Sequence, residues 1–184
     1  MSLLLPEHKP DLKTCQACEL STHGSRFIWG EGNPRAPVFV ILDNPGARED
    51  KTGTPFLCGT RQTLLQGARE AGLSLDQLYV TYILKCRPRK KYNKPQARQT
   101  CLKYLTSQLK TTQPTVIFCL GTVASQAFFQ DATISVKELR GFPHLVKNYP
   151  TFVSYHPLNV RRRPVLYPYF LQDWQLIHSF LKPM

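Results

Sequence analysis

The chain has 184 residues, with 24 Lys and Arg against 12 Asp and Glu. This length is enough for one domain with its own hydrophobic core and no disulfide scaffold. The formal net charge of +12 favours a polyanionic partner, nucleic acid first, because each neutralised phosphate releases condensed counterions. The sequence shows no long apolar run, signal peptide or lipidation motif, which argues against a membrane partner and favours a cytoplasmic protein.

Residues 1–30 are mostly polar and predict an irregular N-terminal arm. Four short apolar stretches, rich in β-branched residues, then predict buried strands: PVFVIL from residue 37, LYVTYIL at 78–84, TVIFCLG at 115–121 and TFVSYHP at 151–157. Helical patterns lie between and after them, at 61–72, 95–111, 122–130 and 168–181. This alternation predicts one α/β domain over residues 1–184, a three-layer α/β/α fold with a central, mainly parallel four-stranded sheet.

Ligands of such sheets bind beyond the carboxyl ends of the strands. This rule selects the loops that follow the four predicted strands: DNPG, KCRPR, LGTVA and YHPLNVRRR. We therefore expect the functional side chains to lie in these loops.

Four of the six cysteines have spacings typical of a metal or cluster site. Cys15 and Cys18 form a Cys-x-x-Cys pair, and Cys86 and Cys101 flank a basic stretch. Four thiolates gathered in this way can hold a 4Fe–4S cluster or a structural zinc ion, and the spacing does not separate the two. The other two cysteines have no partner at such spacing and are treated as non-ligands.

Ordered motifs along the chain resemble those of the family 4 uracil-DNA glycosylases. EGNPRAPVFVILDNPGAREDKTGTPF resembles the family's first active-site block, GEGNPxAxxxxVGEAPGxxEDxxGxPFVG. TYILKCRPR resembles TNxxKCRPP, ELRG resembles KLRG, and YHPLNVRRRP resembles the second active-site block, HPSYLLR. The resemblance implies a DNA glycosylase that leaves an abasic site and, as is usual for the family, acts as a monomer on DNA.

The resemblance also implies a cofactor. The family holds a 4Fe–4S cluster on four cysteines that match Cys15, Cys18, Cys86 and Cys101, which favours a cluster over zinc. Its implied role is structural, because it would pin the N-terminal arm to the segment between Cys86 and Cys101 and present that basic segment to DNA.

Such an enzyme must flip a nucleotide out of the stack, offset positive charge on the sugar and stabilise negative charge on the departing base. Asp43 or Asn44, at the tip of the first strand, could position a water against the anomeric carbon. The superfamily pattern points to Asn44 and the family 4 pattern to Asp43, so both stay open. His156 matches the histidine that donates, as a neutral ring, to the pyrimidine O2. No lysine is placed as a Schiff-base nucleophile, so we expect a monofunctional enzyme.

Further residues are expected to contact the base or the DNA. Phe56 matches the phenylalanine that stacks on the flipped base, and Gly46 is a second expected base contact in the DNPG loop. After the histidine, the family inserts a leucine wedge into DNA and grips phosphates. The residues of this chain expected to share those tasks are Val160, Arg161, Arg162 and Arg163.

The motifs depart from the family where the base is read. Tyr82 stands in place of an asparagine whose amide offers a donor and an acceptor side by side. After Phe56, PFVGxAG becomes PFLCGTR, which places Arg61 near the pocket rim. The substrate is therefore uracil or a modified pyrimidine, such as the hydroxymethylated or glucosylated cytosine of phage DNA that some relatives remove in antiviral defence. A rival from another class is a non-catalytic iron–sulfur DNA-binding module.

Overall fold

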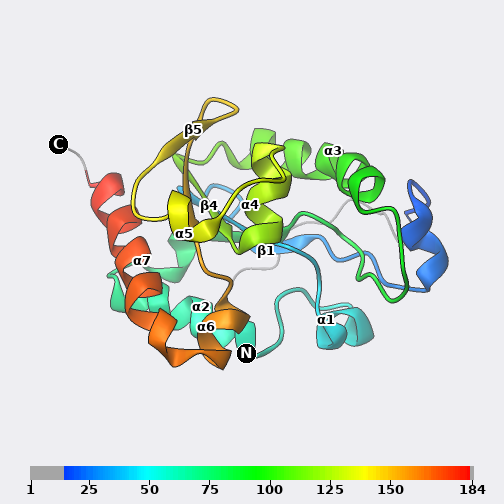
Figure 1. Ribbon diagram of the computed structural model, residues 1–184, viewed down its shortest axis with the longest axis horizontal. Coiled ribbons are helices and arrows are strands. Elements are labelled where there is room, and N and C mark those ends of the chain that lie inside the picture. The colour runs from blue at the N-terminus through cyan, green and yellow to red at the C-terminus, as the bar shows by residue number, and fades with distance from the viewer. Residues whose placement is uncertain (1–14, 183–184) are drawn as a thin grey trace.

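A six-stranded mixed sheet runs through the centre of the molecule (Figure 1). The computed structural model describes residues 15–182, so the first part of the expected N-terminal arm, residues 1–14, lies outside the described residues. The strand order is β1-β3-β2-β4-β6-β5. The strands are β1 (Gly30–Gly32), β2 (Val38–Leu42), β3 (Leu78–Tyr82), β4 (Val116–Leu120), β5 (His144–Val146) and β6 (Tyr149–Ser154).

The central strands β3, β2, β4 and β6 pair in parallel. They are the four strands predicted from the apolar stretches, and the α/β fold class is confirmed. The number of strands needs a correction, because β1 and β5 extend the sheet at its two edges in antiparallel pairing. Each edge strand has only three residues, too few to show the alternation that marks a strand.

Helices of two kinds connect the strands. The longer ones are α2 (Gly59–Glu70), α3 (Lys94–Thr112), α4 (Thr122–Phe129) and α7 (Tyr167–Leu181). These match the four predicted helices. The shorter ones were not predicted, and they are α1 (Ala47–Thr52), α5 (Val136–Leu139) and α6 (Pro157–Arg162), with three 3₁₀ helices, η1 (Glu19–His23), η2 (Leu75–Gln77) and η3 (Pro164–Leu166). Two of these short helices, α1 and α6, follow the carboxyl ends of β2 and β6.

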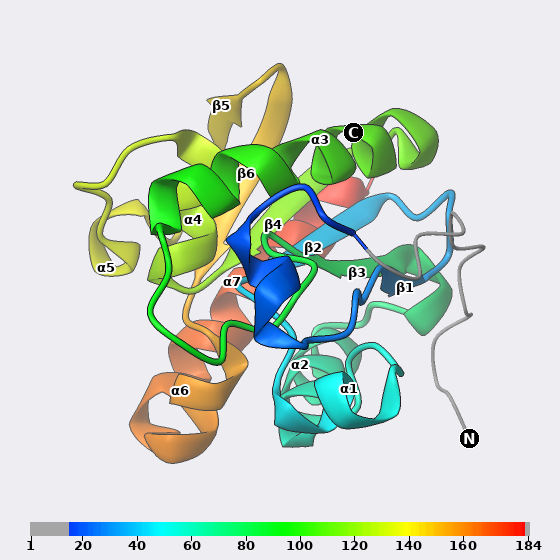
Figure 2. The ribbon, with the colours of Figure 1, turned by 90° about the vertical axis from the view of Figure 1, so that its right-hand side faces the viewer.

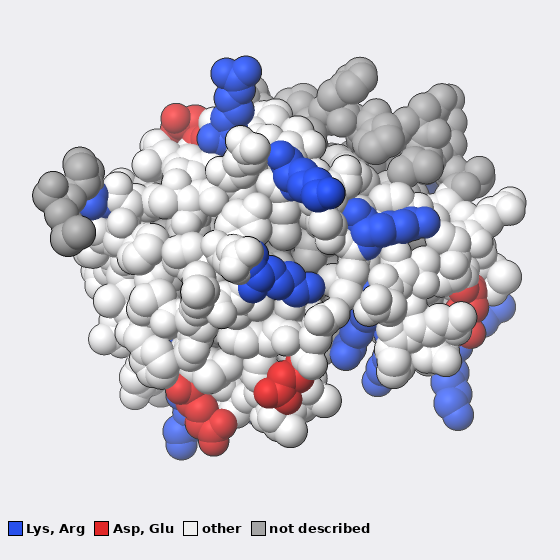
Figure 3. Space-filling view, turned by 90° about the horizontal axis from the view of Figure 1, so that it is seen from above, with Lys and Arg blue, Asp and Glu red and all other residues white. Residues whose placement is uncertain are grey.

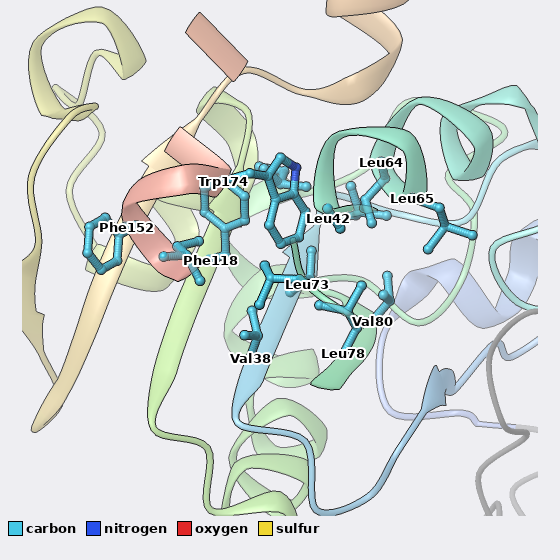
Figure 4. Packing of buried hydrophobic residues seen from close by; sticks show 14 of the residues in the cluster. Val38, Leu42, Leu64, Leu65, Leu73, Leu78, Val80, Phe118, Phe152 and Trp174 are labelled. Atoms are coloured by element: carbon cyan, nitrogen blue, oxygen red, sulfur yellow. The ribbon is translucent and has the colours of Figure 1, made fainter. Parts of the chain in front are cut away.

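One face of the sheet packs against α2 and α7. Side chains alternate along a strand, so Val38 and Leu42 of β2 point to this face. There they join Leu64 of α2, Phe118 of β4 and Trp174 of α7 in one buried cluster (Figure 4). This cluster holds α2 and α7 against the strands that carry the site.

The opposite face is covered by α3 and α4 (Figure 2). Phe39 and Ile41 of β2 point there and share a second buried cluster with Leu105 of α3 and Phe128 of α4. The central strands are thus buried on both faces, which explains why their sequences are continuously apolar instead of alternating. Together the two clusters give the three layers that the sequence predicted.

The basic charge does not form one continuous patch on the face that Figure 3 shows. In Figure 3, Lys and Arg side chains stand apart from one another on a largely uncharged surface. Among residues 15–182, no helix is long and apolar enough to cross a membrane.

Candidate active site

Asp43 and His156 lie against each other at the carboxyl edge of the sheet. Asp43 follows β2 directly, and His156 comes two residues after β6 ends. The Oδ1 atom of Asp43 is 3.4 Å from Nε2 of His156. Their side chains are 35% and 17% exposed, respectively, so a substrate can reach both. The fold therefore brings together two of the three predicted catalytic residues from distant parts of the sequence.

The local structure of His156 decides which ring nitrogen carries the proton. His156 is the N-cap of α6, and its Nδ1 accepts a hydrogen bond from the backbone N–H of Leu158 at 3.1 Å. A nitrogen that accepts carries no proton, so the ring proton sits on Nε2, the atom that faces Asp43. Gly121 makes room for this arrangement, because a Cβ atom there would lie 2.8 Å from the Cβ of His156.

Asp43 is held as a carboxylate. Burial raises its pKa, but the hydrogen bonds from His156 and from the backbone N–H of Asn44 outweigh burial and lower the pKa below its usual value. Asn44 donates its backbone N–H to Asp43 Oδ1 at 2.8 Å and its side-chain Nδ2 to the carbonyl of Pro45 at 2.9 Å. Asp43 thus presents negative charge to the site, while the amide nitrogen of Asn44 is engaged in its own loop.

A second group of predicted residues lies beside Asp43, since Tyr82 pairs with Leu42 in the sheet. The hydroxyl of Tyr82 accepts a hydrogen bond from the backbone N–H of Phe56 at 2.8 Å. Phe56 has a φ of 50°, a left-handed conformation that costs a non-glycine residue energy and is often found at functional sites. Its ring is 1% exposed, and the guanidinium carbon of Arg61 lies 5.4 Å from the ring centre. In this conformation Arg61 takes the place over Phe56 where the resemblance puts a base.

Glu49 is a site residue that the sequence analysis did not single out. It is 2% exposed, and its Oε1 accepts the backbone N–H of Leu57 at 3.2 Å. Its Oε2 is buried and has no hydrogen-bond partner among the described residues. A Cβ atom at Gly46 would lie 2.7 Å from this oxygen, so Gly46 lets the DNPG loop close over the carboxylate. The only signal in the sequence was the position of Glu49 inside the first active-site block.

Tyr82 and Glu49 together present one donor and one acceptor. Burial, followed by the charge of Glu49, raises the pKa of Tyr82 well above its usual value, so the phenol keeps its proton. Within residues 15–182 the hydroxyl makes one hydrogen bond, in which it accepts, and its proton is therefore available to an acceptor. The two side chains could match the edge of a pyrimidine that the family reads with one amide.

Arg61 is tied to the edge of the sheet. It forms an ion pair with Glu31 of β1, which is 2% exposed. Burial lowers the pKa of Arg61, although the nearby Tyr82 acts in the opposite direction. Because β1 was not predicted from the sequence, neither was this partner, and Arg61 proves to be a fixed part of the wall near Phe56.

Asp50 connects the active-site block to the segments that carry the cysteines. It is 1% exposed and accepts hydrogen bonds from the backbone N–H of Arg26 and from Nε of Arg89, both at 2.8 Å. Arg26 belongs to the N-terminal arm, and Arg89 follows Cys86 in the loop before α3. Figure 2 shows the arm, in blue, beside that green loop. One carboxylate thus joins three stretches of the chain.

The four predicted ligand cysteines come from these same stretches. Phe27 of the arm forms a β-bridge with Cys86. Cys86 and Cys101 share the second buried cluster, and Cys18 packs against it. Burial, followed by the neighbouring thiols of Cys101, Cys15 and Cys18, raises the pKa of Cys86 to about 12. They do not form a metal-ligating arrangement as they stand among the described residues. As a donor set, four adjacent thiols fit an iron–sulfur cluster or a tetrahedral metal ion.

The arginines after His156 are exposed, as expected, but Val160 is not. Arg162 and Arg163 line a cavity of about 700 Å³ together with His156, and Arg161 lines a second cavity. Val160 is 2% exposed and packs in the main core cluster. Because α6 turns this side chain inward, Val160 does not present the exposed wedge that the sequence led us to expect.

Comparison with known proteins agrees with this fold. A family model described as the uracil DNA glycosylase superfamily matches residues 29–177. Since the match covers most of the chain, the chain belongs to the uracil DNA glycosylase superfamily, a class of hydrolases that act on DNA. The expected enzyme class is thereby confirmed.

Within that class the chain is similar to type-4 uracil-DNA glycosylases, so the family 4 resemblance is confirmed. It is 30% identical to the Thermotoga maritima enzyme, over 93% of this chain and 91% of the relative. It is 29% identical to the Archaeoglobus fulgidus enzyme, over 91% and 88%, and 29% identical to the Sulfurisphaera tokodaii enzyme, over 95% and 84%.

Proposed function

We propose that this chain is a monofunctional uracil-DNA glycosylase, which flips uracil out of DNA and hydrolyses the bond between uracil N1 and the sugar C1′. The observation that carries the proposal is the 3.4 Å approach of a donor, His156 Nε2, to a carboxylate, Asp43 Oδ1, at the carboxyl edge of the sheet. The names of the type-4 relatives support uracil as the base.

The two groups suit the two charges of the reaction. As the C1′–N1 bond breaks, its electron pair leaves with the base and positive charge builds on the sugar. The Asp43 carboxylate offsets that positive charge and orients a water, whose oxygen forms the new bond to C1′ and whose proton the carboxylate accepts. His156 keeps its Nε2 proton and donates a hydrogen bond to O2 of the departing uracil anion, which takes a proton from solvent.

In the proposed function, Tyr82 and Glu49 recognise the base through hydrogen bonds. Uracil carries an acceptor at O4 and a donor at N3, and these match the Tyr82 proton and the unpartnered Oε2 of Glu49. A pyrimidine with an amino group at C4 would instead point a donor at the Tyr82 proton. Hydrogen-bonded sites of this kind can reject a mismatched base by a factor of about 10⁴. The proposed pair thus favours uracil over 4-amino pyrimidines, including the modified cytosines.

No lysine amine serves as a nucleophile in the proposed mechanism. Lys85 follows β3 but is 0% exposed, and its ammonium donates to Thr81, to the Tyr82 carbonyl and to Gln108 at 2.6–2.8 Å. An amine held in this way does not reach the sugar. The expected product is therefore an abasic site in an uncut strand.

Four cysteines are proposed to hold a structural 4Fe–4S cluster: Cys15, Cys18, Cys86 and Cys101. The cluster would cross-link the arm to the loop before α3. The residues of the chain support this role, because Asp50 fastens both segments to α1 and thereby to the loop that carries Phe56.

The test offers duplexes that contain uracil, thymine, cytosine, hydroxymethylcytosine or glucosylated hydroxymethylcytosine, and measures abasic sites by cleavage in hot alkali. We expect cleavage of the uracil strand alone, and only after alkali. Activity confined to a modified cytosine would replace uracil with that base. Cleavage without alkali would contradict the monofunctional mechanism.

Matched variants separate an enzyme from a non-catalytic DNA-binding module. Asp43→Ala and His156→Ala should abolish abasic-site formation while DNA binding persists. Asp76→Ala and His178→Ala, which alter the same residue types away from the site, should keep wild-type rates. Wild-type protein that binds DNA but releases no base from any duplex would support the non-catalytic module.

A further inference from the structure

Three arginines converge on a pocket beside the proposed base site. The pocket has a volume of about 470 Å³, and its lining includes Arg48, Arg61, Arg161 and the start of α2 at Cys58 and Gly59. Among residues 15–182, no Asp or Glu lines it. The cavity is therefore strongly electropositive, and its lining includes Leu57, which directly follows Phe56 in the chain.

Two of the three positive charges are uncompensated. Arg61 pairs with Glu31, but the structure shows no ion pair or hydrogen bond for the side chains of Arg48 and Arg161 within the described residues. In addition, Nε of Arg61 is buried and has no partner among those residues. The pocket thus holds more donors and more positive charge than the protein itself satisfies.

The guanidinium of Arg161 lies directly against Gly59. A Cβ atom at Gly59 would lie 1.7 Å from its Nη1, so this guanidinium rests directly on the first residue of α2, a 12-residue helix. The N-terminus of a helix carries partial positive charge and free N–H groups. Two positive groups in contact are unfavourable alone, and an anion that binds against both offsets their repulsion.

From these contacts we propose that this pocket binds one phosphate group. Arginine forks and free helix N–H groups match phosphate oxygens in geometry and charge. This inference rests on the proposed function, because DNA is the substrate that would bring a phosphate there. Arg161 lies on α6, the helix whose N-cap is His156, so the subsite would hold the strand next to the flipped nucleotide. A free phosphate compound offers the same chemistry, and the experiment separates the two sources.

The test measures binding instead of catalysis, so that it stays informative if the proposed base or reaction is wrong. Affinity for an uncleavable duplex with an abasic-site analogue is measured against salt concentration. Losing one phosphate contact lowers the slope of log affinity against log salt by about 0.9. We expect this loss for Arg161→Gln and Arg48→Gln, and none for the matched control Arg69→Gln, at the other end of α2.

Gly59→Ala separates the effect of the position of the Arg161 guanidinium from the effect of its charge. The new methyl group would displace the Arg161 guanidinium while the net charge stays the same and α2 gains a better helix former. We expect a loss of slope like that of Arg161→Gln. A neutral methylphosphonate can replace one DNA phosphate at a time. At one position it should weaken binding by the wild type. At that position it should cause no further loss of binding in Arg161→Gln.

The remaining outcomes decide which molecule supplies the phosphate and whether the phosphate site exists. Unchanged DNA slopes, with inorganic phosphate stabilising wild type but not Arg161→Gln in thermal unfolding, would assign the pocket to a free phosphate compound. The phosphate site would be overturned if three variants behaved like the Arg69→Gln control in both measurements: Arg48→Gln, Arg161→Gln and Gly59→Ala. Failure of uracil excision alone would overturn the proposed function and leave the subsite standing.

Discussion

The hydroxyl of Tyr82 holds the backbone N–H of Phe56 at 2.8 Å, and this contact joins the end of β3 to the loop that forms the base site. Phe56 has a left-handed φ of 50°, and its N–H is buried. Tyr82 therefore has two tasks, to hold this loop and, in the proposed reaction, to donate its proton to the base.

Tyr82→Phe tests both tasks. A buried N–H without a partner costs about 1–3 kcal/mol, so we expect the free energy of unfolding to fall by that amount in denaturant titrations. We also expect a higher KM for uracil-containing DNA, because a donor to the base is lost. An unchanged KM together with reduced stability would leave Tyr82 with the structural task alone.

Asp43→Asn should lower the single-turnover rate of base release by a factor of about 10²–10⁴, because a neutral amide neither offsets the sugar's charge nor accepts the proton of the water. Binding to an uncleavable duplex should not weaken. Asn44→Ala should cost less, since the side-chain nitrogen of Asn44 is engaged with Pro45. A larger loss from Asn44→Ala than from Asp43→Asn would reverse this assignment.

Asp43 also predicts a dependence of stability on pH. Its folded pKa is lowered, so its contribution to stability is fully present above its usual pKa of about 4 and is lost as pH falls through the lower folded pKa. Denaturant titrations from pH 6 to pH 3 should show a steeper loss for the wild type than for Asp43→Asn. Parallel curves would contradict the lowered pKa.

Arg140→Met should expose the cost of a buried charge. Arg140 donates from Nη2 to Asp173 Oδ1 at 2.8 Å and from Nε to Oδ2 at 3.1 Å, and Asp173, 1% exposed, also accepts from Ser154 at the end of β6. Removing one partner of a buried pair costs about 3–5 kcal/mol. The loss should be measurable in denaturant titrations at neutral pH.

The pH dependence of that loss has a definite sign. Burial, the largest influence, raises the pKa of Asp173 even in the presence of Arg140, so the folded state takes up a proton more readily than the unfolded state, and acid favours folding at this group. The destabilisation by Arg140→Met should therefore shrink as pH falls. Adding Asp173→Asn should recover part of the stability, and a pH-independent loss would argue against the buried carboxylate as its cause.

The proposed cluster predicts a pattern of iron loss. Cys86→Ser and Cys101→Ser should remove iron and visible absorbance from the purified protein and lower its stability, because ligand binding and folding are coupled. Cys58→Ser, outside the proposed ligand set, should retain both. Zinc in place of iron in the wild type would assign the four thiols to a structural metal ion.

Much of the fold and part of the site followed from the sequence. Continuous apolar strands such as Val38–Leu42 report burial on both faces, and long periodic helices report one apolar face, so the three layers were predictable. Parallel strands end at one edge, so the loops with Asp43 and His156 were predictable as neighbours. Strands of three residues and helices of six residues or fewer carry too little pattern to predict, and β1, α1 and α6 were missed for that reason.

The amino-acid sequence by itself determined the fold class, the family and the loops that carry the chemistry, because these depend on local patterns and ordered motifs. Only the tertiary structure decided which atoms meet. It turned Val160 inward, set Arg61 over Phe56, left Glu49 Oε2 without a partner among the described residues and placed the Arg161 guanidinium against Gly59. The physical reason is that such contacts depend on the packing of segments far apart in the chain, which no local pattern records.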